Sequence, residues 1–198
     1  MTPAAVLETI IRPATRGDCA DIARLFLISS DGLAAYIWSA MQQPGLSLEA
    51  VGAQRYTREG VAFSYQNCLI AAMDSDVIGM LHAFPMERDP NAQPEADPVL
   101  QPYSELEDYG SLYISGIALY PDHRGRGVGT RLLDAAASRA RRLGLPRLSL
   151  ICFEENRRAM ALYRRHGFVE IDRRALVPHP SLKYRSGDAV LLARPLAA

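Results

Sequence analysis

The sequence has few of the residues that would place it in a disulfide-stapled or metal-binding class. Its three cysteines, Cys19, Cys68 and Cys152, lie far apart in 198 residues and form no Cys-x-x-Cys pair or histidine-rich cluster. An odd, scattered set of cysteines beside apolar neighbours predicts reduced, buried thiols. We therefore expect a cytoplasmic protein without a metal site.

A net charge and a long apolar run are also missing. Lys plus Arg and Asp plus Glu both number 22, so bulk charge gives no reason to expect a nucleic acid or a membrane as partner. No apolar stretch approaches the ~18 residues of a membrane-spanning helix. The first residues lack the basic start and apolar core of a signal peptide, so we expect none.

Charge is nevertheless distributed unevenly along the chain. Residues 85–110 contain seven acidic residues and one basic residue, whereas residues 122–147 contain seven arginines and two acidic residues. Two interpretations stay open. The two segments could form two kinds of ligand surface, or their charged side chains could face solvent and form ion pairs with each other within the molecule.

Hydrophobic periodicity predicts an α/β chain with one mixed sheet. Two apolar runs around Asp74–Asp76 indicate a hairpin, and four prolines make residues 87–110 a long loop, with one helical turn near Tyr103–Glu107. No repeat or linker divides the chain, so we expect one domain over residues 1–198. The expected strands cover 7–14, 64–86 as a hairpin, 111–121, 147–153, 168–177 and 189–196, and helices follow Thr15 and cover 31–45, 47–60, 127–143 and 156–167.

The stretch PDHRGRGVGTRLL, residues 121–133, places three glycines and two arginines between a strand and a helix. A helix N-terminus leaves backbone N–H groups unpaired and electropositive, and glycines let an anion approach them. Such a loop suits a phosphate or diphosphate. It is not a Walker loop, and Thr130 stands where a dinucleotide fingerprint needs its third glycine.

Together with this loop, two further stretches resemble the GNAT superfamily of acyl-CoA-dependent N-acetyltransferases. They are the strand YISGIALYP, residues 113–121, and ENRRAMALYRRHGF, residues 155–168. The resemblance covers about residues 111–171. It implies a twisted sheet of six or seven strands flanked by helices, an acetyl-CoA-binding core over about 111–171 and an acceptor-side half over about 1–110.

The resemblance also implies a cofactor site. The strand around Gly116 would splay from its neighbour, and an interior glycine independently suggests a bulge there. Backbone groups of the strand would pair with the pantetheine arm of CoA, amides of the loop would hold the diphosphate, and Asn156 would touch the arm. The implied cofactor-binding residues are Ile117, Ala118, Leu119, Arg124, Gly125, Arg126, Gly127, Val128, Gly129, Thr130 and Asn156.

The implied chemistry is attack of a neutral primary amine on the thioester of acetyl-CoA. By resemblance, Tyr163 is the candidate general acid for the leaving thiolate, and the Leu119 amide is the candidate donor to the oxyanion. For the general base we rank Glu105 and Glu107 first. We keep as alternatives Asp108, His82, and a water relay through Tyr113 and Ser115.

The acceptor and the class of protein stay partly open at this point. Acidic residues in the long loop favour a cationic amine such as a polyamine, an aminoglycoside-like compound or a lysine, and Glu105→Gln should then raise the KM of the acceptor.

A non-catalytic acyl-CoA-binding or sensing module would carry the same glycine loop. A nucleic-acid-binding role is disfavoured, because the arginine-rich stretches have no interleaved aromatic residues and the chain has no excess of basic residues. The last strands could form an edge that pairs two copies into a homodimer.

Overall fold

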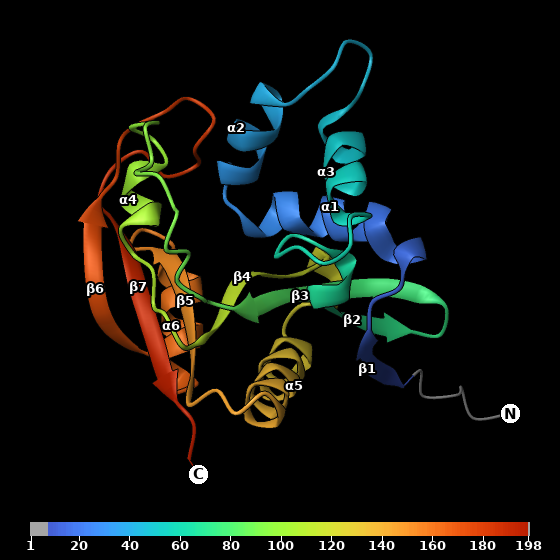
Figure 1. The fold of residues 1–198 in the computed structure, drawn as a ribbon. Helices are drawn as coiled ribbons and strands as arrows, with labels where there is room; N and C mark the ends of the chain where they lie inside the picture. The colour runs from blue at the N-terminus through green and yellow to red at the C-terminus, as the bar shows by residue number, and fades with distance from the viewer. Residues whose placement is uncertain (1–7, 198) are drawn as a thin grey trace, which may run out of the picture.

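One seven-stranded sheet runs through the chain in a computed structural model that describes residues 8–197 (Figure 1). The strand order is β1-β2-β3-β4-β5-β7-β6. Only the β4–β5 pair is parallel. The strands are β1 (Thr9–Pro13), β2 (Cys68–Met73), β3 (Asp76–Pro85), β4 (Leu112–Leu119), β5 (Arg147–Phe153), β6 (Val169–Ala175) and β7 (Asp188–Pro195).

Helices cover both faces of this sheet (Figure 1). One apolar cluster joins one face to α5 and α6, and a second joins the other face to α1, α2 and α3. The mixed α/β fold with a sheet of about seven strands is therefore confirmed. The helices are α1 (Cys19–Ser29), α2 (Leu33–Ala40), α3 (Leu48–Tyr56), α4 (Gln101–Ser104), α5 (Val128–Arg142) and α6 (Arg157–Arg165).

The order of elements follows the sequence patterns closely. Asn156 caps α6, because its side chain accepts a hydrogen bond from the Ala159 amide. Gly167 adopts the left-handed conformation after this helix, with φ of 80°. The loop after β3 contains one short helix, α4, slightly earlier than the expected turn. Leu7, the first residue of the expected first strand, lies outside the described residues.

A β-bulge in the middle of β4 changes which face its side chains point to. His82 of β3 pairs with Gly116 and Ala83 pairs with Ile114, so Ser115 is an additional residue. A Cβ on Gly116 would lie 2.7 Å from Ser29 Oγ of α1, so Gly116 permits a close approach of helix and sheet. The glycine predicted to mark a bulge is therefore next to one.

Strands β4 and β5 separate where this bulge begins. Their pairing covers Leu112, Tyr113 and Ile114 of β4 and ends opposite Leu150. The remaining half of β4, up to Leu119, stays paired with β3 on its other side. A gap therefore opens between two neighbouring strands of one sheet, as expected for a splayed strand.

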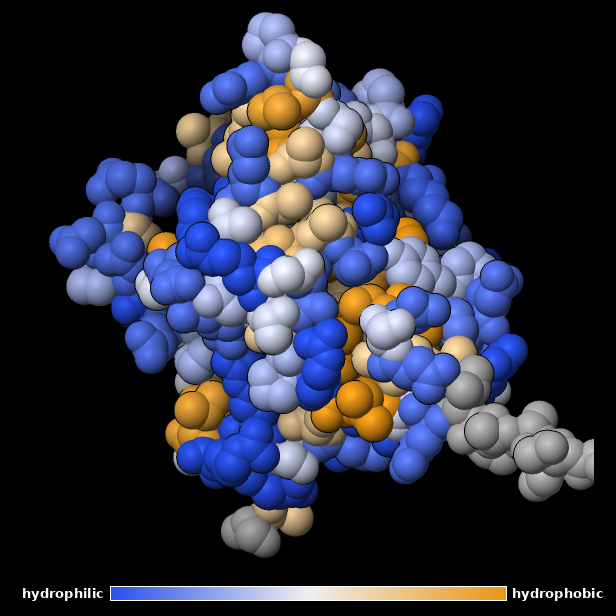
Figure 2. Space-filling model, turned by 90° about the vertical axis from the view of Figure 1, so that its right-hand side faces the viewer, coloured by the Kyte–Doolittle hydropathy of each residue, from blue (hydrophilic) through white to orange (hydrophobic). Residues whose placement is uncertain are grey.

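The sheet ends in two edge strands. Strand β6 exposes about half of Val169 and Ile171, at 57% and 50%, beside charged residues, and charges on an edge discourage pairing. The other edge, β1, lies on the right-hand side of Figure 1, and Figure 2 shows that this side is largely hydrophilic with separate hydrophobic patches. A homodimer stays a prediction.

Two further expectations concern cysteines and membranes. Cys19, Cys68 and Cys152 are free and buried. Burial raises the pKa of the Cys152 thiol to about 12, which keeps it protonated. Within residues 8–197, no helix is long and apolar enough to cross a membrane.

Candidate active site

The gap between β4 and β5 widens into a cavity of about 580 Å³. It is bounded by the free half of β4, the glycine loop, the start of α5 and one side of α6. Ten of the eleven cofactor-binding residues expected from the sequence line it, and Arg126, which is exposed, does not. The ten are Ile117, Ala118, Leu119, Arg124, Gly125, Gly127, Val128, Gly129, Thr130 and Asn156.

Backbone groups of β4 point alternately toward β3 and toward the gap. The Tyr120 amide donates to Ile78 of β3 over 3.0 Å, so by alternation Ala118 also points to β3. The backbone groups of Ile117 and Leu119 then point into the gap. The Leu119 carbonyl accepts a hydrogen bond there from Arg124 Nε over 3.0 Å. The gap therefore offers the backbone groups of Ile117 and the Leu119 amide for hydrogen bonding.

The glycine loop presents backbone donors at the start of α5. Gly125 and Gly127 have φ of 75° and 78°, which favours glycine. No side chain among residues 8–197 caps this helix. The first intrahelical bond runs from the Arg131 amide to Gly127. The amides of Val128, Gly129 and Thr130 precede it and have no helical acceptor.

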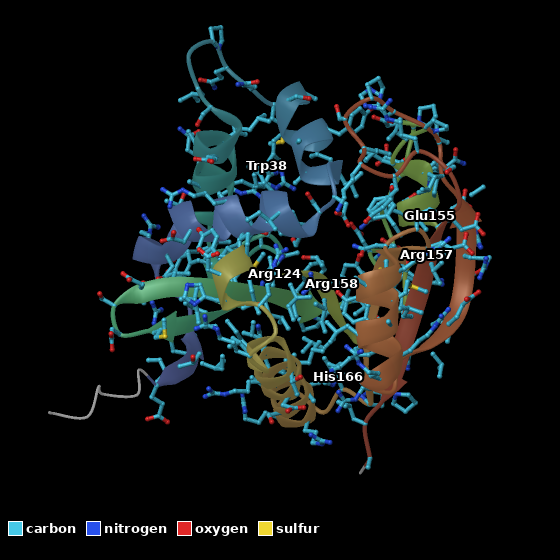
Figure 3. The ribbon with its side chains drawn as sticks, turned by 180° about the vertical axis from the view of Figure 1, so that it is seen from behind. Trp38, Arg124, Glu155, Arg157, Arg158 and His166 are labelled. Atoms are coloured by element: carbon cyan, nitrogen blue, oxygen red, sulfur yellow. The ribbon has the colours of Figure 1, made fainter. Side chains whose placement is uncertain are left out.

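The cavity is positively charged. Arg124, Arg158, Arg165 and Lys183 line it, whereas Asp31 is its only carboxylate in the described part of the chain. Figure 3 shows Arg124, before α5, and Arg158, on α6, beside the space between these helices. A ligand with several phosphates matches this excess of cations.

A second, smaller cavity of about 170 Å³ adjoins the first. It is enclosed by α1, α2, Phe63, the middle of β4 and the end of β5, and aromatic and aliphatic side chains form most of its wall. Five residues line both cavities and therefore lie at their junction. They are Ser29, Asp31, Asn156, Ala159 and Tyr163.

Tyr163 is the aromatic residue among those that line both cavities. Its ring packs edge-on against Phe168, with centroids 5.7 Å apart, which fixes the ring on the inner side of α6. Burial raises the pKa of its phenol well above the usual 10. The hydroxyl therefore stays protonated at neutral pH and is available as a hydrogen-bond donor.

Asp31 is a residue of this region that the sequence analysis did not single out. Its carboxylate accepts hydrogen bonds from Asn156 Nδ2 over 2.8 Å and from Lys183 Nζ over 3.1 Å. It adopts a left-handed φ of 48°, which is uncommon outside glycine. The sequence signal was the Asp-Gly pair at positions 31 and 32, typical of a turn.

His82 and Ser115, two alternatives for the base, are hydrogen-bonded to each other. His82 Nε2 lies 2.9 Å from the Ala62 carbonyl, so this nitrogen carries the proton. Nδ1 then accepts from Ser115 Oγ at 2.5 Å. Burial lowers the pKa of His82 to about 4, so it is a weak base. Ser115 lines the second cavity.

The structure does not bring the first-ranked base candidates to either cavity. Glu105 forms an ion pair with Arg174 of β6 over 2.9 Å, and Glu107 accepts a hydrogen bond from Tyr109. Asp108 pairs with Arg147. Tyr113 does line the second cavity, and burial raises the pKa of its phenol. No group of three or more His, Cys, Asp or Glu among residues 8–197 is arranged to hold a metal.

Comparison with known proteins identifies the family. The sequence model of the Acetyltransferase (GNAT) family matches residues 35–168, which is more than half of the chain. The chain therefore belongs to the GNAT acetyltransferase family, as the resemblance of its motifs predicted.

Curated relatives match only part of the chain. A mycothiol acetyltransferase of Geodermatophilus obscurus is 42% identical over 62 residues, 31% of this chain and 20% of that protein. An uncharacterised N-acetyltransferase of Bacillus subtilis is 38% identical over 60 residues, 30% of this chain and 38% of that protein. The matched stretch thus spans well under half of these relatives.

Solved structures share the fold over nearly the whole chain. An acetyltransferase of Salmonella typhimurium, determined with acetyl-CoA, superposes with a TM-score of 0.62 at 17% identity, covering 96% of this chain and 95% of that one. An N-acetyltransferase of Staphylococcus aureus gives 0.61 at 22% identity, covering 93% and 99%. At these sequence identities the similarity shows that the fold is shared, and nothing more specific.

Proposed function

We propose that this protein is an acyl-CoA-dependent N-acetyltransferase that moves an acetyl group from acetyl-CoA to a primary amine by direct attack. The observation that carries the proposal is the opened edge of β4 beside an uncapped helix N-terminus, with Tyr163 where the two cavities meet. The acetyl-CoA-binding core is then about residues 111–171, and the acceptor side is largely residues 1–110.

The residues of the larger cavity fit acetyl-CoA. Backbone groups of Ile117 and Leu119 would pair with the amides of its arm, as an added strand does. The amides from Gly125 to Thr130, including those of Arg126 and Gly127, would hold the diphosphate, whereas the Arg124 amide already donates to the Pro121 carbonyl. The Asn156 side chain already caps α6 and holds Asp31, and its second amide hydrogen remains for the arm.

Acetyl-CoA supplies a thioester as the acyl donor, and the protein supplies hydrogen bonds around it. The Tyr163 hydroxyl would donate to the sulfur as it becomes a thiolate. Because burial raises the phenol pKa, this phenol is a weaker acid than a free tyrosine, and we assign it a hydrogen bond to the developing thiolate without full proton transfer. The Leu119 amide would donate to the oxyanion.

The incoming amine must lose a proton, and three groups are relevant. Ser115 Oγ and the Asp31 carboxylate both line the second cavity, where they would accept hydrogen bonds from the amine. His82 would hold the Ser115 hydroxyl in place through its hydrogen bond. Glu105 and Glu107 remain predictions of the sequence. Glu105→Gln and Glu107→Gln test them directly, because a large fall in kcat supports the sequence ranking and an unchanged kcat supports the cavity residues.

The alternative, a non-catalytic acyl-CoA-binding module, shares the larger cavity but needs no acceptor site. Calorimetric titration with CoA and acetyl-CoA tests the cavity, and release of free thiol over an amine panel tests the reaction. Binding together with amine-dependent thiol release supports the enzyme. Binding without turnover of any amine supports the module, and absence of binding removes both.

A further inference from the structure

The second cavity contains a half-buried cation without an acidic partner. Arg55 projects from α3 to the cavity wall. Its guanidinium lies over the Phe63 ring, 4.9 Å from the ring centroid, and 3.5 Å from Met41 Sδ, and it forms no salt bridge with a carboxylate among residues 8–197. Burial lowers the pKa of Arg55, which records the cost of holding this charge away from water. A bound anion would offset that cost.

A buried hydroxyl in the same wall also lacks a partner. Tyr103 of α4 lines the cavity, and its oxygen is buried with no hydrogen bond to any described residue. Buried polar groups in native proteins nearly always have a partner. The hydroxyl therefore has a hydrogen bond available for a bound molecule, independently of Arg55.

The rest of the wall is apolar and shaped by large rings. Trp38 is almost fully buried between α2 and α3 (Figure 3), and Phe26 stacks on it with centroids 5.9 Å apart. A Cβ on Gly52 of α3 would lie 2.3 Å from the Trp38 ring, so this wall is firmly packed. At about 170 Å³ the cavity is smaller than the ~300–1,000 Å³ typical of drug-sized ligands.

The charges of the cavity do not suit a polycation. Asp31 is its only carboxylate in the described part of the chain, and Lys183 already pairs with it. Arg55 adds a positive charge. The acidic residues of the loop between β3 and β4 are absent from the wall, and one of them, Asp97, instead accepts a hydrogen bond from Tyr36.

We propose that the acceptor is a small amino carboxylic acid with an apolar or aromatic side chain, whose carboxylate pairs with Arg55. Its side chain lies against Trp38 and Phe26, and its amine reaches Ser115 and Asp31 at the junction with the larger cavity. This inference rests on the proposed function, because it assigns the acceptor of the same reaction.

Matched amines test the carboxylate. Acetyl-CoA turnover is measured with phenylalanine, phenylalaninamide and phenethylamine, which share a ring and an amine, and with leucine and spermidine. We expect kcat/KM for phenylalanine or leucine to exceed that for phenethylamine and spermidine by about 10- to 100-fold, the range of a hydrogen bond to a charged group. Equal or higher values for the amide, phenethylamine or spermidine overturn the inference while leaving the acetyltransferase intact.

Variants of Arg55 test whether this residue causes the preference for acceptors with a carboxylate. Arg55→Leu should raise the amino acid KM at least tenfold, leave the acetyl-CoA KM unchanged and reduce the preference over phenethylamine. Arg141→Leu is the matched control, because Arg141 is exposed on α5 and lines neither cavity. Tyr103→Phe should weaken acceptor binding without lowering the melting temperature.

Binding of phenylalanine and leucine to CoA-saturated protein, measured by calorimetry, separates the two proposals. Binding that Arg55→Leu abolishes and Arg141→Leu retains supports this inference even if turnover is absent. Binding that Arg55→Leu leaves unchanged, or no binding of either amino acid, overturns it. Failure of CoA itself to bind removes the proposed function instead.

Discussion

Asn156 Nδ2 donates a hydrogen bond to the carboxylate of Asp31 over 2.8 Å. This contact joins the start of α6 to the turn between α1 and α2, at the junction of the two cavities. Asn156→Asp keeps an oxygen for the helix cap but sets two carboxylates against each other. We expect the free energy of unfolding to fall by about 1–3 kcal/mol at pH 7, measured by urea denaturation.

The exchanged pair is the control for that variant. Asp31→Asn combined with Asn156→Asp restores one carboxylate and one amide, and Asn tolerates the left-handed backbone of position 31. The double variant should regain most of the lost stability. A double variant no more stable than Asn156→Asp alone would contradict the role of this contact.

Gly129→Ala tests the backbone site at the start of α5. Nothing lies within 4 Å of the position of an added Cβ, and alanine is the better helix former by up to about 1 kcal/mol. The melting temperature should stay the same or rise. The added methyl faces the cavity, so we expect the acetyl-CoA KM to rise about tenfold while the acceptor KM stays unchanged. An unchanged acetyl-CoA KM would place the diphosphate elsewhere.

Tyr163→Phe removes one hydroxyl and keeps the ring that packs on Phe168. If the hydroxyl supports the leaving thiolate, kcat should fall by about 100-fold or more, whereas the KM of acetyl-CoA changes little. Steady-state thiol release measures kcat, and the melting temperature checks the fold. A kcat within threefold of the original would remove Tyr163 from the chemistry.

Asp18 predicts an acid-dependent loss of stability. Hydrogen bonds from Arg12 lower the pKa of this carboxyl from 3.8 to about 2. Because the folded pKa is the lower one, the stabilisation is present above about pH 4 and is lost as pH falls toward 2. Asp18→Asn should cost about 2 kcal/mol at pH 7, and denaturation curves of the two proteins should converge at low pH. A difference independent of pH would contradict this.

Much of the fold was accessible from local patterns in the sequence. The hairpin around Asp74–Asp76 and the helix after the glycine loop follow from periodicity and turn residues, which act over short distances. Gly116 indicated the irregular strand for the same reason. Even the cap at Asn156 could be predicted, because its partner is three residues away.

The acceptor side depends on contacts that local patterns do not contain. Asp31 meets Asn156 across 125 positions of sequence, and Glu105 is held by Arg174 across 69. A run of acidic residues in a loop suggested a cationic acceptor, yet none of these side chains lines either cavity. In the sequence Arg55 has no feature that distinguishes it from other helix arginines. Its place in the cavity wall depends on the packing of α3 beside α2 and Phe63.

The additional residue at Ser115 has a consequence for how this catalytic architecture could be lost. If the codon for Ser115 were deleted, Gly116 would still allow the close approach of α1, and β4 without its bulge could hydrogen-bond with β5 along its full length. The gap would close, although every helix and nearly every core contact remained available. A single deletion of this kind would convert the chain into a stable relative with an uninterrupted sheet and no place for a donor.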